Sequence, residues 1–129
     1  MLRISSVLSI VFLLILSACN NSKTLNFSGE TDNWSAELTV TQTKDDYEKQ
    51  EFKLNYKGKD VTSVGDITYK VDTNAGGFGK SGVKLDENGI LKGTEEANPT
   101  NAKVIEVSEV EVTVEWNDNT EIITLDINK

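Results

Sequence analysis

The sequence predicts an all-β domain, namely an antiparallel two-layer β-sandwich of immunoglobulin-like type with seven to eight short strands after an apolar N-terminal helix. Two observations support this prediction. Several segments alternate between apolar and polar residues, which is the period of a half-buried strand. Turn signals rich in Gly, Asn and Asp separate these segments, and nothing after residue 20 shows a convincing helical period. A small closed barrel of strands is the alternative architecture.

The first half of the domain contains three alternating segments, each with apolar residues at every second position. Their inward faces are expected to bury large side chains such as Trp34 and Phe52. A shorter strand with Leu25 and Phe27 is expected to precede them. The three segments are 34–41, 51–57 and 67–71.

Polar segments between the strands are predicted to be connections. Residues 43–50 are highly charged and are expected to form a solvated connector. Residues 72–82 are rich in Gly and are expected to form a mobile loop. Residues 86–89 form a strong turn signal, which predicts a short hairpin that ends at Gly93. Residues 94–101, with the only Pro, are expected to be another loop.

The last third of the chain is the most strand-like. Residues 104–107 and 110–116 both look like strands, but the inward positions of the two segments are an odd number of residues apart. A one-residue slip would turn the core face outward, so a bulge or bend is expected near Ser108. Trp116 is predicted to be a large core anchor. An Asn/Asp-rich turn then leads to a closing strand with inward residues in 123–127.

The N-terminus has the features of an export signal. Arg3 supplies a positive charge, and residues 4–16 are predominantly apolar. This run is shorter than the ~20 residues that a membrane-spanning helix needs, so it predicts a cleavable signal helix. Ser17 and Ala18 are small, as a signal peptidase requires.

Leu16-Ser17-Ala18-Cys19 resembles the lipobox of bacterial prolipoproteins, whose pattern is Leu, a small residue, Ala or Gly, and then Cys. The resemblance implies that the Cys19 thiol receives a diacylglyceryl group and that cleavage occurs between Ala18 and Cys19. Two acyl chains anchor a protein stably, whereas one does so only marginally. The resemblance covers only about the first twenty residues and implies nothing about the rest.

The expected organisation has three parts. Residues 1–18 are the lipoprotein signal peptide, residues 19–26 are the lipidated Cys and a polar tether, and residues 27–129 are the β-sandwich domain. The tether is short, so the domain is expected to lie close to the membrane. The expected location is the outer leaflet of the cell membrane, with the domain on the extracytoplasmic side.

The composition excludes several functions. The chain has 13 basic and 21 acidic residues, a net charge of −8, which argues against nucleic acid as a partner. It contains no His and one Cys, so His-dependent catalysis, disulfides and ordinary zinc sites are excluded. Calcium is the one plausible metal, although turn chemistry already explains the oxygen-rich runs at 86–89 and 117–121. No cofactor or metal site is predicted.

Residues 77–82 match the pattern G-x-G-x-x-G, but a dinucleotide site requires a helix after this motif and the next segment looks like a strand. The same loop, with Phe78 at its tip and with Lys80, is the first candidate for a contact surface, because long loops on rigid sandwiches often carry recognition. Glu109, Glu111 and Glu115 share one strand face, which is most simply a solvated face. No catalytic residues are predicted.

The expected function is therefore a non-enzymatic binding or interaction module that recognises an unknown protein or envelope component. Two alternatives remain open at this point. One is a small envelope enzyme or enzyme inhibitor, and the other is a structural envelope protein with no specific ligand.

Overall fold

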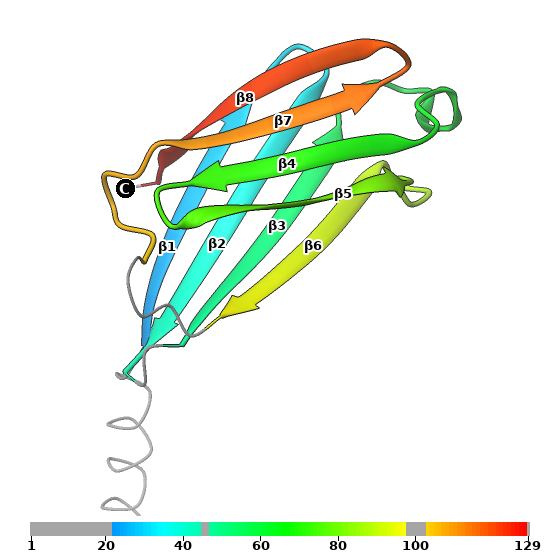
Figure 1. Ribbon diagram of the computed structural model, residues 1–129. Coiled ribbons are helices and arrows are strands. Elements are labelled where there is room, and N and C mark those ends of the chain that lie inside the picture. The colour runs from blue at the N-terminus through cyan, green and yellow to red at the C-terminus, as the bar shows by residue number, and fades with distance from the viewer. Residues whose placement is uncertain (1–21, 45–46, 98–102, 129) are drawn as a thin grey trace, which may run out of the picture.

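The computed structural model describes residues 22–44, 47–97 and 103–128 (Figure 1). This part of the chain is all-β and antiparallel, with eight strands and a single 3₁₀ turn at Val61–Ser63, which confirms the predicted class and strand number. The strands are β1 (Ser22–Glu30), β2 (Trp34–Thr43), β3 (Glu48–Tyr56), β4 (Ile67–Thr73), β5 (Gly76–Val83), β6 (Ile90–Ala97), β7 (Val110–Trp116) and β8 (Asn119–Ile127).

All eight strands belong to one sheet with the order β5-β4-β7-β8-β1-β2-β3-β6. Figure 1 shows that its two halves lie over each other, with β4, β5, β7 and β8 crossing β1, β2, β3 and β6. The halves are joined where β1 meets β8, through the pairs Phe27–Ile127 and Ser28–Asp126. The two layers are thus halves of one folded sheet, so an immunoglobulin-like sandwich of two separate sheets is not confirmed. The sheet is nearly closed, and β5 and β6 are its two edges.

Aromatic side chains connect the two halves through the core. The Trp34 ring from β2 lies 5.2 Å from the Trp116 ring of β7 in an edge-on arrangement, and 5.2 Å from the Tyr56 ring. The Phe52 ring of β3 stacks on the Tyr69 ring of β4 at 5.0 Å. The predicted core positions Trp34, Phe52 and Trp116 are confirmed, because all three are buried. Alternation along the strands therefore selects the residues that join the layers.

The prediction of a hairpin around residues 86–89 is wrong, because β5 and β6, the strands on either side, do not pair with each other. The turn itself is present. The Asp86 Oδ1 atom accepts hydrogen bonds from the backbone N–H groups of Asn88 and Ile90, both at 2.9 Å. After this turn the chain crosses from the half of the sheet that contains β5 to the half that contains β3. There β6 pairs with β3 and continues past Gly93 to Ala97. A turn determines only a local change of direction, whereas the pairing partner depends on long-range packing.

Two segments expected to be loops contain strands. Most of residues 72–82 forms the end of β4 and the edge strand β5, and residues 94–97 belong to β6. Gly has no side chain and therefore hides the alternation that reveals a strand. The expected connector at 43–50 is also shorter than predicted, because β3 begins at Glu48.

Residues 104–107 form a loop rather than the predicted strand. Val104 is buried, but Ile105 and Val107 are 50% and 83% exposed. The backbone N–H of Ser108 donates to the Ile105 carbonyl at 3.0 Å, which closes a turn at the position where a bend was expected. Because this turn separates residues 104–107 from β7, the odd spacing between their inward positions does not turn any core residue of β7 outward.

Strand β1 begins at Ser22, so part of the segment expected to be a tether is paired sheet. The signal segment 1–18, the lipobox and Cys19 lie outside the described residues, as do residues 98–102 of the expected loop around Pro99. Among the residues that the structure describes, no helix is both long and apolar enough to span a membrane.

Candidate binding surface at the open edge of the sheet

The segment predicted to be a contact loop is the edge strand β5. Its pairing with β4 places Phe78 opposite Val71 and Lys80 opposite Tyr69. The Phe78 ring packs edge-on against the Phe52 ring at 6.5 Å, so Phe78 anchors the strand to the core and is not at a loop tip. Lys80 is exposed, as expected for a contact residue.

The glycines of β5 allow it to approach β4 closely. A β-carbon at Gly79 would collide with the Tyr69 carbonyl oxygen, so a side chain at position 79 would push the two strands apart. The register between the strands also shifts between Ile67 and Tyr69, which marks an irregularity in the pairing. The other side of β5 pairs with no strand in the described part of the chain. This edge therefore presents backbone N–H and C=O groups that can accept an added strand.

The inward face beside this edge is mainly aromatic. The hydroxyl of Tyr69 lies where a β-carbon at Gly93 of β6 would be, so Tyr69 reaches across the fold from β4 to the opposite edge strand. A shallow hollow of about 620 Å³ runs along β4 and β5, and Tyr69, Phe78 and Lys80 contribute to its lining. The edge thus combines unpaired backbone groups of β5 with the half-buried Phe78 ring and with two cations, Lys70 and Lys80, of which Lys70 forms an ion pair with Asp72.

Burial raises the pKa of Tyr69 above the ordinary value of 10.0. The folded state then holds the phenolic proton more tightly than the unfolded state, so the contribution of this group to stability is complete below pH 10 and is lost as the pH rises through the folded-state pKa. We expect Tyr69→Phe to behave like the parent at neutral pH and to lose less stability at alkaline pH. Urea denaturation at pH 8 and pH 11 measures the difference, and equal losses in both proteins would contradict the expectation.

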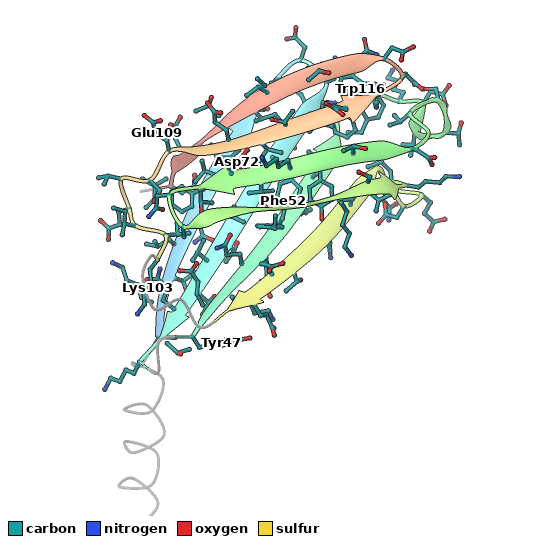
Figure 2. The ribbon with its side chains drawn as sticks, viewed as in Figure 1. Tyr47, Phe52, Asp72, Lys103, Glu109 and Trp116 are labelled. Carbon is teal, nitrogen blue, oxygen red and sulfur yellow. The ribbon has the colours of Figure 1, made fainter. Side chains whose placement is uncertain are left out.

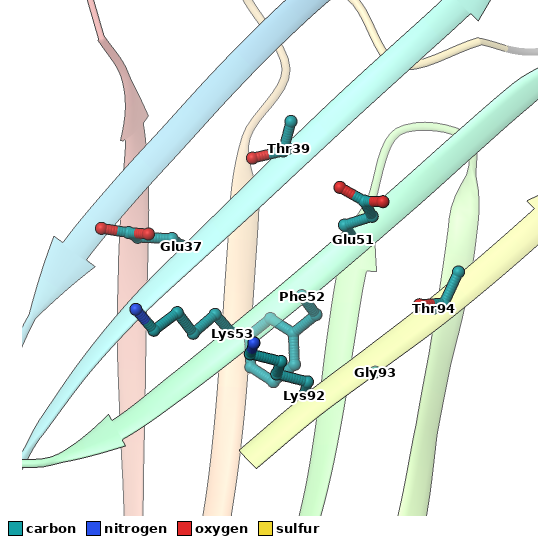
Figure 3. Close-up of a pocket in the computed structure, with 8 residues that line it drawn as sticks. All are labelled: Glu37, Thr39, Glu51, Phe52, Lys53, Lys92, Gly93 and Thr94. Carbon is teal, nitrogen blue, oxygen red and sulfur yellow. The ribbon is translucent and has the colours of Figure 1, made fainter. Parts of the chain in front are cut away.

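A second hollow, of about 330 Å³, lies on the outer face of β2, β3 and β6 (Figure 3). Lys53 and Lys92 are direct neighbours across β3 and β6, and Lys53 pairs in register with Glu37 on its other side. Figure 3 shows the Lys53 side chain directed toward Glu37. Glu51 adds a second carboxylate, so two cations and two anions balance in this hollow. It therefore offers less charge selectivity than the β5 edge.

Glu48 is the one charged residue that is buried among the described residues. Its carboxylate accepts hydrogen bonds from Gln42 Nε2 and Gln50 Nε2, both at 2.8 Å, and from the Val104 backbone N–H at 3.2 Å. A catalytic carboxylate needs oxygens that can reach a substrate, whereas these oxygens are occupied by the protein. Glu48 thus links β3 to the loop that contains Val104. The sequence prediction placed it in a solvated connector, although Glu48 has the inward parity of Phe52.

Most of the other acidic residues considered from the sequence are exposed, but Glu121 in the run 117–121 is half-buried and accepts hydrogen bonds from Thr31 and Asn33. Glu109, Glu111 and Glu115 are all exposed, in agreement with a solvated face. In the run 86–89, the Asp86 Oδ1 atom already accepts the two backbone hydrogen bonds of the turn described above. No group of three or more potential metal ligands occurs within 22–44, 47–97 and 103–128. The motif at 77–82 lies in β5, and the turn and strand that follow cannot supply the helix N-terminus that a dinucleotide site requires.

Comparisons with protein-family models, curated proteins and solved structures reveal no match to this chain. The functional interpretation therefore depends on the residues and geometry described above, of which the open β5 edge is the strongest feature.

Proposed function

We propose that this chain is an extracytoplasmic lipoprotein, anchored in the outer leaflet of the cell membrane by diacylglyceryl-Cys19, that binds a protein or another envelope component along the β5 edge. The lipobox-like residues 16–19 support the anchor. The observation that supports binding most directly is the unpaired, Gly-rich edge of β5 beside Tyr69, Phe78 and Lys80.

The chemistry of the edge suggests the kind of partner. An extended segment can add to a sheet edge through main-chain hydrogen bonds, and neighbouring side chains then select its sequence. Lys80 favours a segment with an acidic residue nearby. It also disfavours the register in which two copies of β5 would pair with Lys80 opposite Lys80, because like charges would then meet. The partner is therefore a different chain that contributes an extended, partly acidic segment.

If Cys19 carries the lipid, the parent protein and a variant without the thiol should separate into different phases in detergent extraction. The parent protein purified from cells is expected to enter the detergent phase, and Cys19→Ser is expected to enter the aqueous phase because it cannot carry the lipid. Immunoblotting of the two phases measures this. An aqueous location for both proteins would refute the anchor.

The edge predicts a site-specific cross-link. A photoreactive residue at position 80 of the anchored protein is expected to capture an extended segment of a partner in intact cells, which mass spectrometry would map. Thr124 is the matched control, because it is exposed but lies within β8, where both neighbouring positions in the sheet are filled. Equal capture at positions 80 and 124, or capture of a second copy of this chain, would contradict the proposed binding mode. No capture at either would favour a structural protein without a specific ligand.

A further inference from the structure

The loop Lys103–Ser108, which we call the strap, carries exposed apolar side chains at the end of the domain where β1 begins. Three large apolar side chains are exposed in the described part of the chain, and two of them, Ile105 and Val107, belong to the strap. Figure 2 shows Lys103 and Tyr47 toward this end of the domain. Neighbouring exposed apolar residues on a soluble domain indicate a contact surface more strongly than a single one does.

The strap is held in place by hydrogen bonds to two strands, β2 and β3, and to the β4–β5 turn. Val104 is buried and is bound through Glu48 and through Gln42 Nε2, which donates to its carbonyl at 2.6 Å. Asn74 Nδ2 donates to the Lys103 carbonyl at 2.7 Å, and the Ser108 hydroxyl donates to Asn74 Oδ1. Because both ends of the strap are fixed, the outward direction of Ile105 and Val107 is a property of the fold.

An ion pair connects the strap to the beginning of β1. Lys23 Nζ lies 3.3 Å from Glu106 Oε1. In the sequence, Glu106 stands between the two exposed apolar residues of the strap. The pair places the strap beside the N-terminal end of the first strand. The positive charge of Lys23 also balances the negative charge of Glu106, the acidic residue next to Ile105 and Val107 in the sequence.

Covalent geometry limits the distance between this end and the lipid. Cys19 is three residues before Ser22, and a chain spans at most about 3.6 Å per residue, so the two α-carbons are separated by at most about 11 Å. If Cys19 carries the lipid, the start of β1 and the strap beside it must lie next to the bilayer. The tether makes this contact intramolecular, so even two apolar side chains suffice to orient the domain.

We propose that Ile105 and Val107 insert into the interfacial region of the bilayer that holds Cys19, and so fix the orientation of the domain on the membrane. The proposal rests on the lipid anchor proposed above. The occupant of this surface is the lipid bilayer, because the short distance to Cys19 keeps the strap beside the membrane. The net charge of −8 gives the chain no general electrostatic attraction to an anionic membrane. Apolar contact is the attraction that remains.

The test uses the full lipidated protein in vesicles that contain brominated phosphatidylcholine and phosphatidylglycerol, whose bromine atoms quench nearby tryptophan fluorescence. Val107→Trp is expected to lose emission intensity and to shift to shorter wavelength relative to vesicles without bromine. Ile122→Trp is the matched control, because Ile122 is 58% exposed but lies on β8, and its emission is expected to be unchanged. The native Trp34 and Trp116 are buried and contribute equally to both proteins.

Mass spectrometry of Cys19 separates the two proposals. A lipidated protein in which neither tryptophan is quenched would overturn the strap contact and leave the anchor intact. An unmodified Cys19 would overturn both. Quenching in Val107→Trp that requires added cell-envelope protein would assign the strap to a protein partner and overturn the bilayer contact. Ile105→Trp provides a second reporter, with the same expected result, if Val107→Trp does not fold.

Discussion

Trp34→Ala is expected to lower the free energy of unfolding by about 3–5 kcal/mol, the usual cost of removing a buried Trp or Phe side chain. Trp34 is fully buried and contacts both Trp116 and Tyr56, so its loss leaves a cavity where the two halves of the sheet meet. Small domains have a total stability of about 5–15 kcal/mol, so this single change removes a large part of it. Urea denaturation of the parent and the variant measures the difference.

Trp34→Phe is the matched control for this prediction. It keeps an aromatic ring in the core and removes the indole N–H, which is buried without a hydrogen-bond partner among the described residues. We therefore expect a clearly smaller loss than for Trp34→Ala, because part of the lost packing is offset by removal of an unpaired polar group. Equal losses in the two variants would contradict this expectation, because the retained phenyl ring would then preserve none of the packing that Trp34 provides.

Glu48→Ala is expected to destabilise the domain by about 2–4 kcal/mol, at about 1–2 kcal/mol for each buried or part-buried donor left without an acceptor. The donors concerned are Gln50 Nε2 and the Val104 backbone N–H, because Gln42 Nε2 still donates to the Val104 carbonyl. The loss should be concentrated at the strap. Hydrogen exchange at Val104 is therefore expected to become faster than exchange in the centre of β7.

Glu51→Ala separates this effect from a general effect of charge. Glu51 is exposed and forms a 3.0 Å ion pair with Lys49 on the outer face, and such surface pairs contribute about 0–1 kcal/mol. We expect its removal to leave exchange at Val104 unchanged. If Glu48→Ala and Glu51→Ala have the same effect on stability and exchange, the buried carboxylate does not fasten the strap.

Some local features of the fold could be predicted because their causes lie within a few residues. The alternation in β2, β3, β4 and β7 identifies the inward face of each strand, and that face is buried in the structure. The turn before β8 has positive φ at Asn117 and Asp118, as a two-residue hairpin turn requires and as Asn and Asp tolerate. These are short-range properties of the backbone and of side-chain chemistry.

The candidate site was predicted only in part. The region around Phe78 and Lys80 was predicted to be a contact surface on a mobile loop with Phe78 at its tip, whereas the structure forms it as the edge strand β5. Its identity as an edge strand depends on β4, which provides the pairing partner, and on Phe52, which holds Phe78. Gly-rich segments carry little information about pairing, because the side chains that would indicate the buried face are missing.

The sequence by itself determined the all-β class and the faces of most strands, whereas the export and lipidation signal at residues 1–19 stays a prediction. Only the tertiary structure decided that the strands form one folded sheet, that β6 pairs with β3, and that Glu48 is buried against Val104. The physical reason is distance along the chain. Alternation and turn chemistry act between neighbouring residues, whereas strand pairing and the burial of Glu48 depend on groups tens of residues apart, whose contact is decided by packing of the whole domain.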